Sequence, residues 1–422
     1  MRIPKVRNVL LAILIIGVIL GFGLVIAQDQ ETLRVRTPIG AADPRFPDYL
    51  ARLAGRPITS GDAYRPLRNG VETFPAMLGA IEGAKSRISF ETYIFSEGEV
   101  SDKFTRALIA AAKRGVRVQL VLDSVGASDS QREDVKAMQA AGIQIGWFNP
   151  VSDTKIEEAN YRTHRKILVV DGEVAFVGGV GLADHWIGNA DSVEHWRDTQ
   201  FEIRGPAADN VEAGFHENWI ETGGIVEPIV APRNAAPAGD ARSVVVWTSA
   251  EAGANALKLV YLLTIGAARE TLDIQSPYFI TDESTYWSLL EARKRGVRVR
   301  VLTEGDATDA KPVKFAGRAG YESLMVNGIE VYEFQPTMMH VKTMVADGVV
   351  SVIGSANFDN RSLELNDELN VVVASRTLAS QLTSDFENDI RRSLKLNLDE
   401  WHSRPLHIRG REQFWSYFGE IF

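Results

Sequence analysis

The alternation of apolar and polar positions along this chain follows the same order twice. Short apolar runs at residues 88–95 and 272–280 are each followed by a segment of helical periodicity, at 103–113 and 284–294. In both copies the sequence Arg-Gly-Val then leads into a second apolar run, and its glycine stands where helices commonly end. Short buried strands that alternate with amphipathic helices predict a fold of α/β layers.

Three segments of the chain recur at nearly constant spacing, which indicates a duplicated domain. RGVRVQLVLD recurs as RGVRVRVLTE after 181 residues, AGIQIGWFNP as NGIEVYEFQP after 186, and THRKILVVDGEVAFVGG as MHVKTMVADGVVSVIGS after 176. Regular displacement of three segments favours duplication over chance. We predict a first domain at 66–223, a linker with several prolines at 224–243, a second domain at 244–404 and an aromatic-rich tail at 405–422.

The N-terminal segment has a different pattern from the rest. Arg2, Lys5 and Arg7 precede an unbroken apolar run at 9–27. As a helix this run would reach about 28 Å, close to the thickness of a bilayer core. The basic flank predicts that residues 1–28 form a single-pass membrane anchor with the body on the extracytoplasmic side. A cleaved signal peptide is the alternative, although its apolar region usually has only about 7–15 residues.

Composition and charge narrow the classes of function. The chain has 422 residues, a formal charge of −9 and no cysteine. Without the three basic residues of the N-terminal segment, the body carries −12. General nucleic-acid binding requires neutralisation of phosphates, so we expect no nucleic-acid partner. The lack of cysteine excludes disulfides, thiolate metal ligands and a cysteine nucleophile.

Each copy of the repeat ends in the motif His-x-Lys-x4-Asp, followed by a glycine turn. The six residues of the two motifs are His164, Lys166, Asp171, His340, Lys342 and Asp347. Alternate residues of a strand share one face, so the histidine and lysine of each copy project to the same side. Both aspartates precede a glycine, which is typical of a turn, and we expect their role to be mainly structural.

The paired histidines and lysines fit the transfer of a phosphodiester. That reaction needs a nucleophile, a proton donor for the leaving alcohol and cations for the phosphate oxygens. One copy has only one histidine and one lysine, so two facing copies would form one complete site. A single His-x-Lys pair is more often an exposed polar edge, but its recurrence with the same aspartate and turn favours catalysis. Because the lysines supply positive charge, we expect neither a metal nor a cofactor.

With these motifs the chain resembles the phospholipase D superfamily. The segments HRKILVVDG and GSANFDNRSLELNDELN are most similar to bacterial cardiolipin synthases. The resemblance covers about residues 66–404 and implies two α/β domains around a pseudo-twofold axis, with one site at their junction. It implies phosphatidyl transfer between phospholipids, with phosphatidylglycerol as the expected substrate. It also implies that His164 attacks phosphorus and that His340 transfers protons.

The resemblance assigns supporting roles to further residues. A carboxylate downstream of each motif orients a histidine in this family, and the matching positions are Asp198 and Glu368. Ser355 and Asn357 follow the glycine of the second motif, as the family expects. Glu91 matches a pocket acid of similar enzymes, although burial at the edge of the core is an equal alternative.

The first half departs from the family pattern at two positions. It has Gly179 and Gly181 where the second half has its serine and asparagine. The amide that would help to hold phosphate is therefore missing from one side, and we predict an asymmetric site. Nearby aromatic residues, including Trp186, Trp196 and Phe358, are candidates to shield an intermediate from water, and core packing explains each of them equally well.

Several alternatives remain open from the sequence. The acceptor alcohol could be water, which would make the protein a phospholipase D that releases phosphatidic acid. A nuclease fits the acidic body less well, and an inactive lipid-binding descendant fits the two complete motifs less well. A metal site formed by Asp184, His185, Glu194 and His195 is a weaker candidate, because their spacing matches no standard ligand pattern. The aromatic tail either touches a membrane interface or packs on the body.

Overall fold

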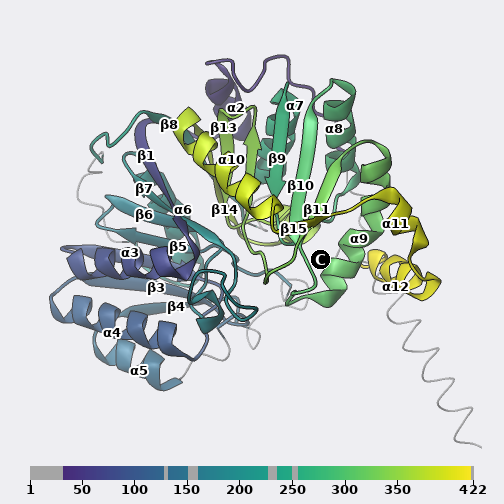
Figure 1. Ribbon diagram of the computed structural model, residues 1–422. Coiled ribbons are helices and arrows are strands. Elements are labelled where there is room, and N and C mark those ends of the chain that lie inside the picture. Colours follow the sequence, from purple (N-terminus) through teal and green to yellow (C-terminus); the bar gives the residue numbers. More distant parts are fainter. Residues whose placement is uncertain (1–31, 128–131, 151–159, 227–234, 250–254, 420–422) are drawn as a thin grey trace, which may run out of the picture.

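The computed structural model describes residues 32–127, 132–150, 160–226, 235–249 and 255–419 (Figure 1). The predicted anchor at 1–28 lies outside these residues. Within the described part of the chain, no helix is long and apolar enough to cross a membrane.

The first half alternates strands and helices as the apolar pattern predicts. The run at 88–95 contains a strand and the segment at 103–113 belongs to a helix, so both predictions are confirmed. The described elements of this half are β1 (Ile58–Arg68), α3 (Asn69–Gly83), β2 (Arg87–Thr92), α4 (Glu99–Lys113), β3 (Arg117–Asp123), α5 (Arg132–Ala140), β4 (Gln144–Phe148), β5 (Ile167–Val170), β6 (Val174–Gly178), η1 (Asp184–Trp186), β7 (Thr199–Arg204) and α6 (Ala207–Glu221).

The second half repeats this order and adds a short C-terminal extension. Its described elements are β8 (Ala241–Trp247), α7 (Asn255–Ala267), β9 (Thr271–Gln275), α8 (Glu283–Lys294), β10 (Arg298–Glu304), α9 (Lys311–Val326), β11 (Glu330–Phe334), β12 (Thr343–Ala346), β13 (Val350–Gly354), η3 (Arg361–Leu365), β14 (Leu369–Ala374), α10 (Arg376–Ile390), β15 (Ser393–Lys395), α11 (Leu398–Ser403) and α12 (Leu406–Ser416). The N-terminal helix α2 (Phe46–Ala54) packs on this half, where Phe46 and Leu50 join its core.

The strands of the described ranges form one 15-stranded sheet in which the two halves have the same strand order. The first half reads β4-β3-β2-β5-β6-β7-β1, and the second reads β11-β10-β9-β12-β13-β14-β8 with β15 added at its edge. The antiparallel pair β1–β8 joins the halves. The prediction of an α/β fold with two homologous domains is therefore confirmed. β1 and β8 straddle the predicted boundaries, because they begin at Ile58 and Ala241.

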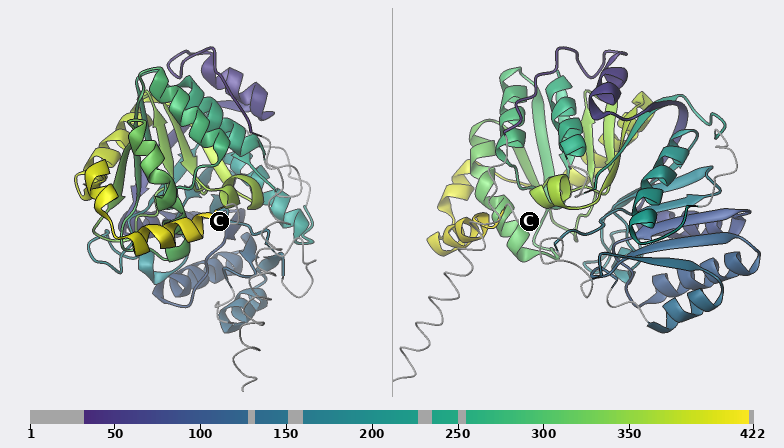
Figure 2. Two further views of the ribbon diagram at one scale, coloured as in Figure 1. Left: turned by 90° about the vertical axis from the view of Figure 1, so that its right-hand side faces the viewer. Right: turned by 180° about the vertical axis from the view of Figure 1, so that it is seen from behind.

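Hydrophobic packing makes the halves one body. Each half has its own core on the outer face of its sheet, under α3, α4 and α5 or under α7, α8 and α9 (Figures 1 and 2). A third core lies between the halves and includes Phe215 of α6, Leu382 of α10 and strand residues from both halves. Because apolar surface from both halves is removed from water there, this inner layer holds their relative position.

Candidate active site

The two motif histidines lie where the parallel strands of each half end. β5 runs antiparallel to β2, and β12 runs antiparallel to β9, so the start of β5 and of β12 meets the carboxyl end of its neighbour. Two isolated backbone bridges connect the halves at this point. Thr163, which precedes His164, pairs with Asp367, which precedes Glu368 of the opposite half. In the same way Met339, which precedes His340, pairs with Arg197, which precedes Asp198.

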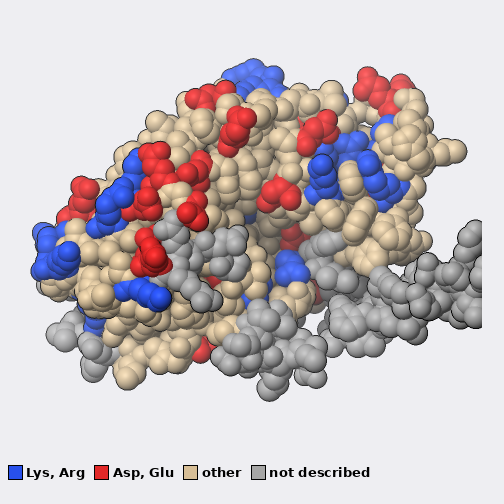
Figure 3. Space-filling view, turned by 90° about the horizontal axis from the view of Figure 1, so that it is seen from below, with Lys and Arg blue, Asp and Glu red and all other residues tan. Residues whose placement is uncertain are grey.

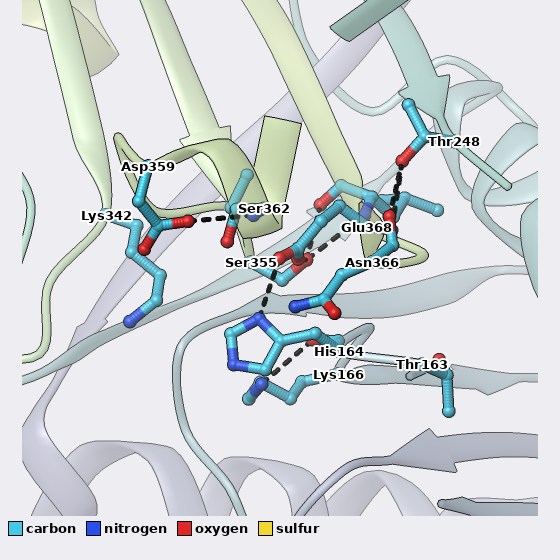
Figure 4. Close-up of polar contacts among 12 residues, drawn as sticks. Thr163, His164, Lys166, Thr248, Lys342, Ser355, Asp359, Ser362, Asn366 and Glu368 are labelled. Carbon is cyan, nitrogen blue, oxygen red and sulfur yellow. Dashed lines mark hydrogen bonds and ion pairs between the residues drawn. The ribbon is translucent and has the colours of Figure 1, made fainter. Parts of the chain in front are cut away.

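These bridges place each histidine next to a carboxylate of the opposite half. His164 Nδ1 lies 2.8 Å from Glu368 Oε1 (Figure 4), and His340 Nδ1 lies 2.9 Å from Asp198 Oδ2. Both carboxylates are fully buried. A carboxylate next to Nδ1 holds the proton on that nitrogen, which leaves the Nε2 lone pair of each imidazole for the substrate. Neither half can therefore orient its histidine without the other.

The two lysines are placed by the same contact in each half. Lys166 Nζ donates to the carbonyl oxygen of His164, and Lys342 Nζ donates to that of His340, both at 2.8 Å. Burial lowers the pKa of Lys166 to about 7 and that of Lys342 to about 8, although Glu368 and Asp198 oppose the shift. Figure 4 shows that Lys342 reaches from the second half toward the space beside His164.

Burial and the nearby lysines keep both imidazoles neutral. Burial lowers the pKa of His164 to about 4, and Glu368 opposes this shift while Lys166 and Lys342 add to it. The pKa of His340 lies well below its ordinary value because of burial, both lysines and His164. A bound phosphodiester carries one negative charge and would offset the effect of the lysines. The site thus combines two neutral nitrogen nucleophiles with two cations, which suits an anionic phosphorus centre.

Aromatic rings surround the histidines unequally. The rings of Trp186 and Trp196 each lie 5.5 Å from that of His340. His164 has Tyr93 at 5.4 Å, and that ring also lies 5.5 Å from Lys166 Nζ. Tyr93 was not among the site residues predicted from the motifs. Its signal was its place after a buried parallel strand, because the carboxyl ends of such strands line ligand sites.

The predicted asymmetry has a structural explanation. Ser355 Oγ donates to Glu368, which holds His164. In the first half a Cβ on Gly179 would lie 2.6 Å from Asp198 Oδ2 and 2.8 Å from the carbonyl oxygen of His340, so no side chain fits. Trp186 Nε1 donates to Asp198 Oδ2 at 3.0 Å instead. The indole therefore replaces the hydroxyl as the donor to the carboxylate.

Two asparagines have free acceptor groups near this pocket. Asn357 Oδ1 and Asn366 Oδ1 are buried, and neither has a hydrogen-bond partner among the residues that the structure describes. Figure 4 shows Asn366 beside His164 and Glu368. In the first half, a Cβ on Gly181, which matches Asn357, would lie 3.1 Å from the Trp186 ring. The amides are therefore confined to the side of the second half.

Glu91 lies behind the first motif. It is fully buried and accepts hydrogen bonds from Thr163 Oγ1 at 2.5 Å and Asn218 Nδ2 at 2.7 Å. Burial raises its pKa to about 7. These contacts support the residue before His164, so they favour the alternative of a buried core-edge acid over that of a pocket acid.

The motif aspartates do not join the histidines. Asp171 follows β5 and accepts backbone N–H groups of Lys85, Ser86 and Arg87, while Asp347 follows β12 and accepts those of residues 269–271. Both have positive φ angles, 56° and 51°, at the turn into the next strand. The strand separates each aspartate from its histidine. This placement agrees with the mainly structural role, because neither aspartate lies with the histidines and lysines that would act on the substrate.

The residues considered for a metal site have separate contacts. Asp184 accepts the backbone N–H groups of Glu99 and Val100 at the start of α4. His195 contacts Asp191, and the ring of His185 lies between those of Trp186 and Trp196. In the described ranges, no group of three or more histidine or acidic side chains could hold a metal ion.

The surface of the molecule is hollowed between the halves (Figure 3). Seen from below, the surface sinks near the middle of the molecule, and basic and acidic side chains are visible inside (Figure 3).

Comparisons with known proteins agree with the repeated architecture. The family described as "Cardiolipin synthase, PLD-like domain" matches residues 77–219 and 261–390. Cardiolipin synthase from Geobacillus sp. (strain WCH70) is 31% identical over 387 residues, which cover 90% of this chain and 76% of that protein. Cardiolipin synthase 2 from Bacillus cereus is 32% identical over 377 residues, which cover 86% of this chain and 72% of that protein.

One solved structure shows the same fold at low identity. The crystal structure of phosphatidylserine synthase from Haemophilus influenzae Rd KW20 has a TM-score of 0.70 and 13% sequence identity, and the match covers 89% of this chain and 100% of that chain.

Proposed function

Since this chain belongs to the phospholipase D superfamily, with cardiolipin synthase-like domains in both halves, we propose that it is a phosphatidyltransferase that makes cardiolipin from phosphatidylglycerol. The observation that carries this proposal is the crossed pairing of His164 with Glu368 and of His340 with Asp198. It presents two imidazole Nε2 atoms and two lysines to one phosphorus, and both halves are required for it.

The reaction proceeds in two balanced steps. In the first, His164 Nε2 attacks phosphorus, the bond to the leaving glycerol oxygen breaks, and His340 gives that oxygen a proton. In the second, His340 takes a proton from the incoming hydroxyl, whose oxygen attacks phosphorus and breaks the P–N bond. Lys166 and Lys342 stabilise the charge on the non-bridging oxygens in both steps. His340 has to receive its first proton with the substrate bound, because its pKa is strongly lowered in the free site.

The acceptor is the hydroxyl of a second phosphatidylglycerol rather than water. A lipid acceptor competes with water only if the phosphohistidine is shielded while it waits. Trp186 and Trp196 pack against His340, the base that would activate an attacking water, and supply apolar surface beside it. Tyr93 lies next to the His164 ring. The curated relatives described above are cardiolipin synthases, which supports the same choice.

Product analysis tests this proposal. Purified full-length protein in phosphatidylglycerol vesicles should yield cardiolipin and glycerol in equal amounts. Phosphatidic acid as the main product would identify a phospholipase D instead. The His164→Ala variant serves as the control, because it should form neither product while it keeps its fold.

We also propose that residues 9–27 anchor the protein in the membrane with its body on the extracytoplasmic side. The basic flank and the apolar run support this topology. Protease added to intact spheroplasts should then degrade the body. Protection in intact spheroplasts, with digestion only after lysis, would reverse the orientation.

A further inference from the structure

The C-terminal helix α12 exposes an apolar stripe. Leu406, Phe414 and Tyr417 are 81%, 56% and 79% exposed. They are eight and three residues apart, a spacing that puts them on one side of a helix and the turn that follows it. The opposite side packs on α9, where the buried Glu412 accepts from Arg318 and Arg404. The helix is therefore fixed to the body while its apolar side faces solvent.

This helix points toward the end of the molecule that carries the site. A Cβ on Gly419, just after α12, would lie 3.4 Å from Ile280 Cγ2. Ile280 donates its backbone N–H to the carbonyl oxygen of Phe358, which directly follows Asn357 in the second motif loop. Figures 1 and 2 show α12 beside α9 at the outer edge of the second half.

The described chain begins next to the same turn. Thr32 Oγ1 donates to Glu283 Oε2 at 3.0 Å, and the Leu33 N–H donates to Ser284 Oγ at 2.9 Å. Glu283 is three residues after Ile280, a separation of at most about 10 Å. The apolar run at 9–27 ends five residues before Thr32. The segment proposed to enter the membrane therefore joins the body close to α12.

The charge on α12 complements an anionic lipid surface. The helix carries Arg409 and Arg411, both exposed, and its one acidic residue is the buried, ion-paired Glu412. Its exposed surface is thus basic, whereas the body as a whole is acidic. Basic and aromatic residues around an apolar stripe are typical of helices that lie in the interface of a bilayer.

We propose that α12 lies on the surface of an anionic phospholipid bilayer, with Leu406, Phe414 and Tyr417 inserted at the boundary between headgroups and acyl chains. This contact turns the end of the molecule that carries the two histidines toward the lipid that holds the substrate. The contact of α12 with lipid is argued from its exposed residues and charge, and it rests on the proposed function only because a lipid substrate requires the site to face the bilayer.

Spin labelling of the full chain tests the contact directly. The chain has no cysteine, so Tyr417→Cys and Val326→Cys each give a single label site. Val326 is the matched control, since it is 63% exposed and ends α9, whereas Tyr417 is close to the site end. In vesicles that contain phosphatidylglycerol, the label at 417 should become several-fold less accessible to a polar nickel relaxer and more accessible to oxygen. The label at 326 should stay accessible to nickel.

Two results would overturn the proposal. Equal nickel accessibility at both positions in vesicles would mean that α12 stays in water. Loss of access to both relaxers at 417, with dipolar broadening between labels, would mean that a second copy of the chain covers the stripe. Neither result depends on the product of the reaction, so failure of the docking surface is distinct from failure of the proposed function.

A second variant measures the consequence for turnover. Phe414→Ser combined with Tyr417→Ser should lower the rate on vesicles about tenfold and leave the rate on monomeric short-chain phosphatidylglycerol unchanged. Val326→Ser should change neither rate. An equal loss on both substrates would indicate damage to the fold and contradict a role in docking.

Discussion

Ser355 and Trp186 have the same role in the two halves, because each donates a hydrogen bond to the carboxylate that holds a histidine. Ser355, which directly follows Gly354 at the end of β13, donates to Glu368, whereas Trp186 donates to Asp198 from η1. The two halves therefore place the same reacting groups with different supporting groups. Duplication conserved the geometry around each imidazole, and the side chain that maintains it changed.

The surroundings of the two histidines differ in the same sense. The His164 side chain is 14% exposed and has one aromatic neighbour, whereas that of His340 is 6% exposed and lies against two tryptophans. Burial and the two lysines lower the pKa of both histidines. The more hydrated His164 takes up a proton more readily, which by itself favours the reverse of the assigned roles.

The largest effect is expected from removal of either histidine. His164→Ala and His340→Ala should each lower kcat by about 10³-fold or more, and the double variant should be scarcely worse, because residues that act as a unit are non-additive. Steady-state rates on phosphatidylglycerol vesicles, with circular dichroism as the control for folding, measure this. A folded single variant with a tenth of the normal activity would contradict a site shared by the halves.

An activated substrate separates the two roles. With a nitrophenyl phosphatidyl ester, the leaving group needs no proton, so His340→Ala should release a stoichiometric burst of nitrophenol and retain a phosphatidyl group on His164. His164→Ala should give no burst. The opposite pattern would exchange the roles of the two histidines.

The next largest effect is expected at position 179, where the first half has no room for the side chain that Ser355 has in the second half. Gly179→Ser copies the second half, but its Cβ would meet Asp198 and the His340 carbonyl, so kcat should fall about 10²-fold. Ser355→Gly copies the first half and should cost only about tenfold, since one hydrogen bond is lost. Gly79→Ser is the control, because a Cβ there meets no atom within 4 Å. Normal activity of Gly179→Ser would mean that Asp198 does not need its present position.

A smaller effect is expected from the indole donor. Trp186→Phe keeps an aromatic ring beside His340 and removes the hydrogen bond to Asp198, so kcat should fall about tenfold or slightly less. Trp196→Phe is the matched control, because Trp196 contacts His340 through its ring. Equal losses in both variants would assign Trp186 to packing alone.

The sequence predicted the local elements and the reacting groups, because both depend on short-range patterns. The strands β2 and β9 and the helices α4 and α8 follow from the periodicity of short segments, and the two His-x-Lys pairs stand out because one motif recurs after 176 residues. The crossed pairing could not be predicted in the same way. His164 and Glu368 are 204 residues apart, and backbone bridges between the halves decide which carboxylate reaches which histidine.

The sequence also could not predict that Trp186 donates to Asp198 in the first half, in the role that Ser355 has in the second. Its indole lies against Gly181, where a Cβ would meet the ring at 3.1 Å, and it comes from a different element, η1. A missing serine looks like a loss in the sequence, although the structure has a donor in its place. The residue types therefore indicated the chemistry, while the support of each histidine depended on packing.

The smallest expected effect is on the pH dependence of kcat/KM, to which Lys166 and Lys342 should contribute differently. A lysine binds phosphate only when protonated, and burial lowers the pKa of Lys166 to about 7 and that of Lys342 to about 8. Activity should therefore be present below these values and be lost as the pH rises through them, by about threefold between pH 6.5 and 7.5 for a group with a pKa near 7. Lys166→Arg keeps its charge at every accessible pH, so this limb should move upward, and Lys342→Arg should leave it in place. The fall of kcat should be smaller, because the bound phosphodiester stabilises the ammonium form. A profile of kcat/KM that is flat from pH 6 to 9 would mean that neither ammonium group is lost from the free site in this range.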